Sequence, residues 1–358
     1  MERIKNIVSS INDLDAKAMT LARERQDQLT KPQGSLGVLE ELSIRLAGIS
    51  GNPRPELGKK VVIVMAGDHG VTASGVSAFP SEVTPQMVAN FIAGGAAINV
   101  LARHVGAEVR VVDMGVAAVI DDPKVIIKKV AAGTLNMAEG PAMTRAEAIA
   151  AILAGAEVAA AEIASGATIL ATGDMGIGNT TASTAILAAL TDLDVSEITG
   201  RGTGLDDDRL ALKVKVIRQA LDINNPDKED PIDVLAKVGG FEIGGLAGVI
   251  LEAAKSNVPV VIDGFISGAA ALLAARIAPK SVSYMIASHV SVEPGHRLIL
   301  REIGLAPMLH MDMRLGEGTG ASLALNLVEA ACKILDEMAT FAEAGVAEKE
   351  TEEIAPIQ

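Results

Sequence analysis

Long runs of apolar residues that end abruptly in glycine limit the folds open to this chain more than any other feature of its sequence. The clearest is Val61-Val62-Ile63-Val64-Met65-Ala66, which stops at Gly67. Four comparable runs follow, over residues 109–114, 168–172, 258–262 and 284–287. A strand that is apolar at consecutive positions is buried on both faces, as in a parallel sheet. These runs therefore predict the strands of a parallel sheet.

Stretches with helical periodicity separate the expected strands, over residues 85–104, 145–164, 207–221 and 265–277. Strands that alternate with helices predict a parallel sheet covered by helices. Aromatic residues make up only 2% of the chain, so Ala, Val, Ile, Leu and Met must form the core. The fold class we predict is α/β, a parallel sheet flanked by helices on both faces, with a small helical lobe from both chain termini.

The helical lobe is expected because both ends of the chain show helical spacing without a strand. Residues 11–25 and 39–49 precede the first strand, and residues 321–341 follow the last one. The expected parts are a large α/β substrate-binding domain over 58–315, a small helical lobe over 1–57 and 316–345, and a frayed tail over 346–358.

The charge of the chain argues against nucleic acid as a partner. Forty-five acidic and 31 basic residues give a formal net charge of −14, which would repel a phosphate polymer. No apolar signal core follows Met1, and the longest uncharged run, 83–102, contains too many polar residues for a lipid span. The single cysteine, Cys332, lies in an apolar pattern and is interpreted as a small buried residue. We expect a cytoplasmic protein that binds neither nucleic acid nor membrane.

A glycine-rich loop indicates where a ligand would bind, since ligands of open parallel sheets lie beyond the carboxyl ends of the strands. The run at 168–172 leads into Gly173-Asp174-Met175-Gly176-Ile177-Gly178-Asn179-Thr180-Thr181, and a helix is expected to follow. Free N–H groups at such a helix start attract an anion, although the spacing also suits a plain tight turn. The spacing matches neither a P-loop nor the dinucleotide pattern.

A second glycine-rich loop, Gly200-Arg201-Gly202-Thr203-Gly204, leads to three aspartates at 206–208. These favour a capped helix start over a metal site, since they follow a glycine loop and not a strand. Lys213, on the same helix, is interpreted either as a solvated lysine or as the counter-charge of a phosphate.

Three further groups of residues lie near strand ends. The pair Asp68-His69 is typical of a strand-end hydrogen bond more often than of a catalytic pair. Phe79, in a Ser/Pro loop, is either a stacking platform for a flat ring or a plug at the core edge. His289, Glu293 and His296 could suggest a metal, but the intervening Pro-Gly prevents one helix from presenting all three, so we expect no metal.

Glu317 lies between two glycines, Gly316 and Gly318, just before the last helix. Its glycine neighbours leave room for the backbone to place this carboxylate in a pocket. By spacing alone, however, neutralising the start of the following helix is the slightly favoured interpretation over catalysis.

Taken together, these loops resemble the nicotinate-nucleotide–dimethylbenzimidazole phosphoribosyltransferase family. The resemblance covers residues 28–335 and rests on eight stretches in the family's order. They are Thr30 to Gly37, Ala66 to Val71, Gly173 to Thr181, Gly200 to Gly204, Val238 to Glu242, Asp263 to Ile266, Ser288 to Ser291 and Leu315 to Gly320. The family often carries glutamate at the position of Asp174, which puts a ribose-hydroxyl contact there in question.

The resemblance implies transfer of phosphoribosyl from nicotinate mononucleotide to 5,6-dimethylbenzimidazole, with α-ribazole 5'-phosphate and nicotinate as products, in assembly of the cobalamin lower ligand. It also implies a homodimer and Glu317 as the catalytic base. No cofactor and no metal are expected, because no pyrophosphate departs. We expect the nucleotide to contact Asp174, Gly176, Gly178, Asn179, Thr180, Gly202, Thr203, Gly204, Lys213, Asp263 and Ser291. We expect the base to contact Ser77, Phe79, Gln86, Met175 and Leu315.

Two other functions remain open at this point. A transferase that uses phosphoribosyl diphosphate would need magnesium at Asp206 to Asp208. A non-catalytic nucleotide-binding protein could use the same glycine loops, although storage requires no base such as Glu317. The accepted base could also be a purine or a phenol.

Overall fold

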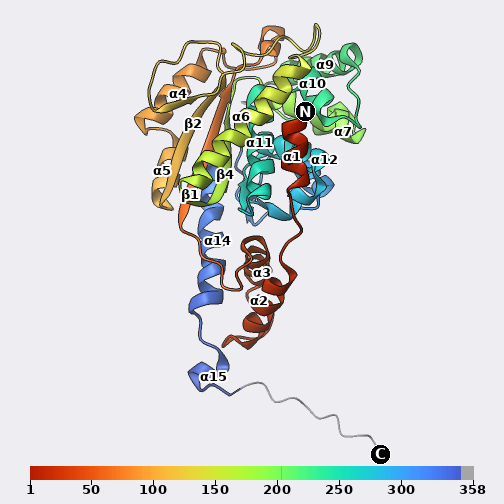
Figure 1. Ribbon diagram of the computed structural model, residues 1–358. Helices are drawn as coiled ribbons and strands as arrows, with labels where there is room; N and C mark the ends of the chain where they lie inside the picture. Colours follow the sequence, from red (N-terminus) through yellow and green to blue (C-terminus); the bar gives the residue numbers. More distant parts are fainter. Residues whose placement is uncertain (203, 348–358) are drawn as a thin grey trace, which may run out of the picture. The chain divides into compact units, whose positions relative to one another are not determined.

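A computed structural model of the chain describes residues 1–202 and 204–347 (Figure 1). Its centre is a parallel six-stranded sheet in the order β3-β2-β1-β4-β5-β6. The strands are β1 (Lys59–Gly67), β2 (Ala107–Gly115), β3 (Val125–Ile127), β4 (Ala167–Met175), β5 (Val260–Ile262) and β6 (Met285–Ala287). From Lys60 onward every residue of β1 is buried, as its unbroken apolar run predicts. The predicted α/β fold class is confirmed.

The strand order positions the ligand site. The chain moves outward from β1 through β2 to β3, then returns to β4 and moves outward in the other direction. Right-handed crossovers consequently place α4 (Val83–Ala93) and α5 (Ala97–His104) on one face, and α6 (Arg145–Ala164), α11 (Phe241–Lys255) and α12 (Phe265–Ile277) on the other (Figure 1). The carboxyl ends of β1 and β4 therefore flank the point where ligands of such sheets bind.

Small residues let α6 and α11 pack in direct backbone contact. A Cβ atom on Gly155 would lie 1.8 Å from the carbonyl oxygen of Gly245, and one on Gly248 would lie 1.9 Å from that of Ile152. Any larger residue at either position would force the helices apart. This contact explains how a core with few aromatic residues stays closely packed.

The expected helix over 85–104 is wrong in one respect, because the structure contains two helices there. Gly94 adopts a left-handed φ of 78° and ends α4, and α5 begins at Ala97. Val83–His104 is long and apolar enough, with a mean hydropathy of 1.2, to cross a membrane as one helix. Neither α4 nor α5 alone reaches the roughly 20 residues that a spanning helix needs.

Further elements complete this part of the chain, among them the helix expected over 207–221. They are η1 (Gly70–Ser74), α7 (Asn179–Thr191), α8 (Val195–Ile198), α9 (Asp207–Asn224), α10 (Pro231–Val238), η2 (Pro279–Tyr284), β7 (His289–Val290), α13 (Pro294–Ile303) and β8 (Leu309–His310). Strands β7 and β8 form a separate two-stranded sheet.

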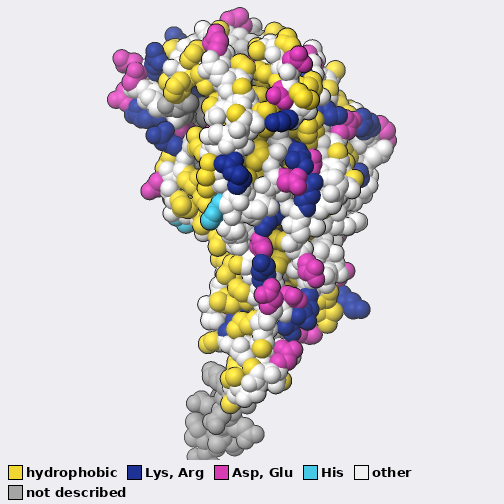
Figure 2. Space-filling view, turned by 90° about the vertical axis from the view of Figure 1, so that its left-hand side faces the viewer, with side chains coloured by type: hydrophobic (Ala, Val, Ile, Leu, Met, Phe, Trp, Pro, Cys, Tyr) yellow, Lys and Arg dark blue, Asp and Glu magenta, His cyan; other side chains and the backbone are white. Residues whose placement is uncertain are grey.

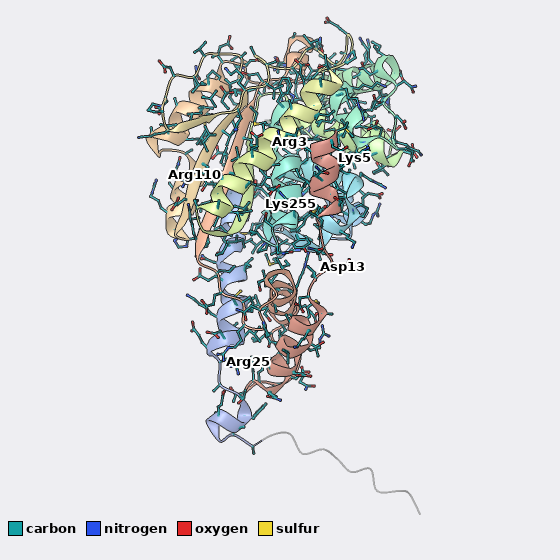
Figure 3. The ribbon with its side chains drawn as sticks, in the orientation of Figure 1. Arg3, Lys5, Asp13, Arg25, Arg110 and Lys255 are labelled. Atoms are coloured by element: carbon teal, nitrogen blue, oxygen red, sulfur yellow. The ribbon has the colours of Figure 1, made fainter. Side chains whose placement is uncertain are left out.

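The chain divides into two compact units. The larger one contains Met1–Asp13 and Leu57–Asn326, and the smaller one contains Leu14–Glu56 and the described residues from Leu327 onward. The larger unit thus includes α1 (Glu2–Ser9), unlike the expected lobe over 1–57. Apolar burial explains the difference, since Ile4 and Ile7 are buried, and Arg3 forms an ion pair with Glu157 at 2.8 Å (Figure 3).

The smaller unit is helical. It consists of α2 (Ala16–Gln28), α3 (Val38–Ser50), the second half of α14 (Thr319–Glu337) and α15 (Phe341–Ala344). Ala22, Ile44, Ala47 and Leu335 form its core. Arg25 ties α2 to the end of α14 through the carbonyl oxygens of Leu335, Asp336 and Met338 (Figure 3). From residue 348 on, the expected frayed tail lies outside the described residues.

Candidate functional site

A cavity of about 480 Å³ lies beyond the carboxyl ends of the strands. Loops that follow β4, β5 and β6 line it, together with α4 and the turn that precedes α14. Its size falls in the range of small-molecule sites, roughly 300–1,000 Å³. All of its lining residues belong to the larger unit.

Glu317 reaches this cavity from a strained turn. Gly316, Glu317 and Gly318 have φ angles of 82°, 63° and 90°, and a left-handed conformation is unfavourable for a glutamate. The turn packs directly on β4, because a Cβ atom on Gly173 would lie 2.5 Å from the carbonyl oxygen of Glu317. The backbone N–H of Glu317 also donates to the carbonyl oxygen of Asp174 at 3.2 Å. These contacts keep the residue in its unusual conformation.

The carboxylate of Glu317 is buried, with 5% of the residue exposed. Its Oε2 accepts a hydrogen bond from the backbone N–H of Ile98 at 3.3 Å, at the start of α5. Burial raises the pKa of Glu317 above its usual value, and the negative charge of Asp263 adds to the rise. A carboxylate with a raised pKa is a stronger base, as proton abstraction requires.

Asp263, and not Glu317, neutralises the start of α14. Its Oδ1 accepts from the N–H of Ala321 at 2.8 Å, and its Oδ2 accepts from that of Gly318 at 3.2 Å. The interpretation of Glu317 as the cap of that helix is therefore wrong. Asp263 itself does not line the cavity, in contrast to the nucleotide contact expected for it.

Asp174 is the second carboxyl group on the cavity wall. Its Oδ2 accepts from the side-chain amide of Asn179 at 3.0 Å, whereas Oδ1 is buried without a hydrogen-bond partner among the described residues. Burial raises the pKa of Asp174 well above its usual value, and the nearby charges of Asp263, Glu242 and Glu317 raise it further.

An anion-binding arrangement lies beside these carboxyl groups. Gly178, with a φ of 95°, precedes α7, and the positive end of this helix lies there. The N–H groups of Asn179 and Thr181 already donate to the carbonyl oxygens of Gly176 and Gly178, at 3.1 and 3.0 Å. A smaller hollow next to the helix start shares Gly176, Ile177, Asn179, Thr180 and Gly202 with the main cavity. Gly178, Ser77 and Lys213 line this hollow but not the main cavity.

Lys213 supplies a positive charge to the hollow. Its Nζ donates to the hydroxyl of Thr180 at 2.8 Å and to the carbonyl oxygen of Gly200 at 3.2 Å. The residue is fully buried, and burial lowers the pKa of its ammonium group from 10.5 to about 8. The interpretation of Lys213 as a solvated lysine is therefore wrong.

Part of the cavity wall is apolar. Phe79, Met175 and Leu315 line it, as expected for the base, and Phe79 is half exposed. Val83 and Met87 of α4 lie on the wall, whereas Gln86 is exposed and does not. The exposure of Phe79 contradicts its interpretation as a plug at the core edge.

The other expected site residues divide between the cavity and its surroundings. Ser291 lines the cavity, but Gly204 lines neither hollow, and Thr203 lies outside the described residues. His289 and Glu293, considered above only as metal ligands, line the cavity as well. Their position directly after the last strand of the sheet was the signal that could have identified them. In the described part of the chain, no group of three His, Cys, Asp or Glu side chains is arranged to hold a metal ion.

The Asp68-His69 pair forms part of a buried support beneath the site. Nε2 of His69 lies 2.6 Å from Oε1 of Glu242, and both side chains are almost fully buried. Burial opposes protonation of His69, but the charge of Glu242 outweighs it and raises the pKa of the imidazole. This ion pair links the end of β1 to the start of α11, and we assign it no catalytic role.

Comparisons with known proteins match this chain over nearly its whole length. A family model described as phosphoribosyltransferase matches residues 11–346. The nicotinate-nucleotide–dimethylbenzimidazole phosphoribosyltransferase of Chloroflexus aggregans is 61% identical over 98% of this chain and 99% of its own length. The protein of the same name from Desulforudis audaxviator is 58% identical over 97% of this chain and 99% of its own. The crystal structure of CobT from Thermus thermophilus superimposes with a TM-score of 0.90 at 50% identity, covering 93% of this chain and 100% of that one.

Proposed function

Because the chain belongs to the nicotinate-nucleotide–dimethylbenzimidazole phosphoribosyltransferase family, we propose that it transfers phosphoribosyl from nicotinate mononucleotide to 5,6-dimethylbenzimidazole. The products are α-ribazole 5'-phosphate, which enters the lower ligand of cobalamin, and nicotinate. One observation carries the proposal most directly, namely a buried carboxylate with a raised pKa, Glu317, in the same cavity as an anion-binding helix start.

Two groups of lining residues suit the two substrates. The phosphate binds at the start of α7 with Lys213, where the positive end of the helix and an ammonium group line the same hollow. The flat base binds between Phe79, Met175 and Leu315. Asp174 also lines the cavity, and its Oδ1, which has no hydrogen-bond partner among the described residues, would accept from a ribose hydroxyl.

Glu317 removes the proton that the reaction must release. One ring nitrogen of the benzimidazole attacks C1' of the ribose, and the electrons of the glycosidic bond pass to the positively charged pyridinium, which leaves as nicotinate. The other ring nitrogen loses its proton to the carboxylate of Glu317. Attack opposite the leaving group converts the β-nucleotide into an α product. Orientation of both rings against one ribose supplies much of the rate.

The rival use of phosphoribosyl diphosphate receives little support from Asp206 to Asp208. Asp206 accepts from the N–H of Arg209 at 2.9 Å, as a helix cap does, and Asp207 pairs with Arg201. All three aspartates are exposed. Their arrangement suits a capped start of α9.

A product assay tests the proposed function. The purified protein is incubated with nicotinate mononucleotide and a panel of benzimidazoles, purines and phenols, with EDTA present, and the products are identified by mass. We expect α-ribazole 5'-phosphate and an equal amount of nicotinate. Activity that requires both magnesium and phosphoribosyl diphosphate would refute the proposal, and binding without turnover of any base would favour a nucleotide-binding protein.

Replacing Phe79 with alanine tests the site of the base. We expect KM for the benzimidazole to rise several-fold more than KM for the nucleotide, since aromatic stacking adds about 0.5–1.5 kcal/mol beyond area burial. Phe79 is half exposed, so the variant should remain folded. Steady-state kinetics with each substrate varied in turn measure the two constants, and equal effects on both would place the base elsewhere.

We further propose that the protein acts in the cytoplasm as a homodimer. The α4–α5 side exposes many hydrophobic side chains (Figure 2), and only 33% of the most apolar window in Val83–His104 is buried. A dimer interface on this side would remove that surface from water. Sedimentation velocity at assay concentration measures the assembly directly, and the mass of a single chain would contradict it.

A further inference from the structure

The start of α13 brings a carboxylate that the proposed reaction does not use next to the second glycine-rich loop. Glu293 directly precedes α13, and 7% of the residue is exposed. Its Oε1 accepts a hydrogen bond from the backbone N–H of Gly202 at 3.0 Å. Its Oε2 is buried without a hydrogen-bond partner among the described residues. A negative charge of the protein therefore already lies beside the region that we assign to the phosphate.

The conformation of this loop depends on the carboxylate. A Cβ atom on Gly200 would lie 1.8 Å from Oε2 of Glu293, so a larger residue there would displace the carboxylate. The carbonyl oxygen of the same Gly200 accepts the hydrogen bond from Nζ of Lys213. Glu293, the loop and Lys213 consequently form one connected group at the hollow.

The negative charge of Glu293 favours the charged form of Lys213. The hydrogen-bond partners of its ammonium group in the described part of the chain are neutral, a hydroxyl and a carbonyl oxygen. Burial favours the uncharged amine, and the charge of Glu293 opposes that effect. An uncharged lysine would attract a phosphate far more weakly.

The other elements packed against α9 offer Lys213 no comparable counter-charge. From α7 it meets the hydroxyl of Thr180. The charged residue of α8, Glu197, is exposed, and Asp233 and Lys237 of α10 pair with each other at 2.9 Å. On the loop side, the guanidinium group of Arg201 pairs with Asp207, and that of Arg314 donates to the carbonyl oxygen of Gly202.

We propose that Glu293 is a positioning residue of the phosphate subsite. Its carboxylate orients the loop through the N–H of Gly202 and places a counter-charge near the buried Lys213, so that the loop and the lysine are arranged for a phosphate monoester before the nucleotide enters. This role rests on the proposed function, because the phosphate is that of the nucleotide substrate. Glu293 acts through Gly202 and Lys213 and does not touch the reacting atoms.

Two substitutions separate the two effects of Glu293. Glu293→Gln retains an oxygen that accepts from Gly202 but loses the charge, and Glu293→Ala loses both. In the glutamine variant we expect KM for nicotinate mononucleotide to rise about fivefold or more at pH 8.5 and less than about twofold at pH 6.5, where Lys213 stays protonated without help. In the alanine variant the rise should appear at both pH values. The KM for the benzimidazole should stay unchanged in both.

Glu302→Gln provides the matched control, since Glu302 lies on the same helix in an exposed pair with Arg276. Circular dichroism and thermal unfolding show whether each variant folds. Inorganic phosphate serves as a second probe by calorimetry, because its binding should follow the same pH pattern without any turnover. The protein could bind phosphate in a way that depends on Glu293 and still transfer no phosphoribosyl group. That result would refute the proposed function, but Glu293 would remain a positioning residue for phosphate.

Two results would overturn the proposal. A glutamine variant that matches the native protein at both pH values would show that the charge has no effect on Lys213. Tighter nucleotide or phosphate binding by either variant would mean that Glu293 competes with the phosphate instead of preparing its site.

Discussion

Replacement of Glu317 by glutamine is expected to lower turnover by roughly 10²–10⁴-fold and to leave both substrate affinities nearly unchanged. The amide preserves the size of the side chain, and its oxygen can still accept from the N–H of Ile98 at the start of α5. It cannot accept the proton of the benzimidazole. Loss of a charge at a helix start costs a few tenths to about 1 kcal/mol of stability, so the variant should remain folded.

The same residue predicts how the rate of the native protein depends on pH. Because burial raises the pKa of Glu317, the carboxylate becomes protonated at a higher pH than an exposed glutamate does. Turnover should therefore fall as the pH drops through this raised pKa, and the glutamine variant should lack that acid limb. Single-turnover rates between pH 4.5 and 8 measure both effects, and Glu337→Gln, at an exposed position of α14, is the control. A folded glutamine variant with near-native turnover would remove Glu317 from the mechanism.

Local patterns were sufficient to predict most of the sheet and several helices. Strands such as β1 and β4 are buried along almost their whole length, and α6 and α12 have the bounds expected from their periodicity. Helix α11 was missed because all but one of its residues are buried, so it lacks the polar face on which a helical period depends. The break between α4 and α5 was also missed, because apolar residues on both sides continue the pattern across the Gly94-Gly95 pair.

The loops of the site could be predicted from their positions after strands, but the partners of their side chains could not. Glu317 bonds to the N–H of Ile98, 219 positions away in the chain, and spacing near Glu317 carries no information about that contact. For the same reason the cap of α14 was assigned to the adjacent Glu317 and not to Asp263, which arrives from the end of β5. Burial of Lys213 has a similar origin, since three separate segments enclose it: α7, the Gly200 loop and the start of α13.

Replacement of Lys213 by methionine is expected to weaken binding of nicotinate mononucleotide by about 1.5–3 kcal/mol, or roughly 10–150-fold in Kd, without loss of stability. Methionine fills a similar volume but cannot contact a phosphate. The effect of the substitution on stability follows from the pKa of Lys213, which burial lowers from 10.5 to about 8. Below pH 8 both the folded and the unfolded chain carry the proton, so the folded state bears the full cost of a buried charge.

Between pH 8 and 10.5 the unfolded chain binds more protons than the folded one, and this lysine therefore makes the native protein more stable as the pH rises. The methionine variant should lack that contribution. At pH 7 the methionine variant should be as stable as the native protein or more so. It loses the two hydrogen bonds to Thr180 and Gly200, worth about 1 kcal/mol each, but it no longer buries a charge, and this gain offsets the loss. Thermal unfolding at pH 7 and 9.5 and calorimetric titration with the nucleotide measure the two properties, with Lys215→Met, exposed on the same helix, as the control. A buried charge that lowers the stability of the folded chain is explained by a ligand that needs it. Unchanged nucleotide affinity together with a marked loss of stability in the methionine variant would instead mean that Lys213 stabilises the fold and does not bind the nucleotide.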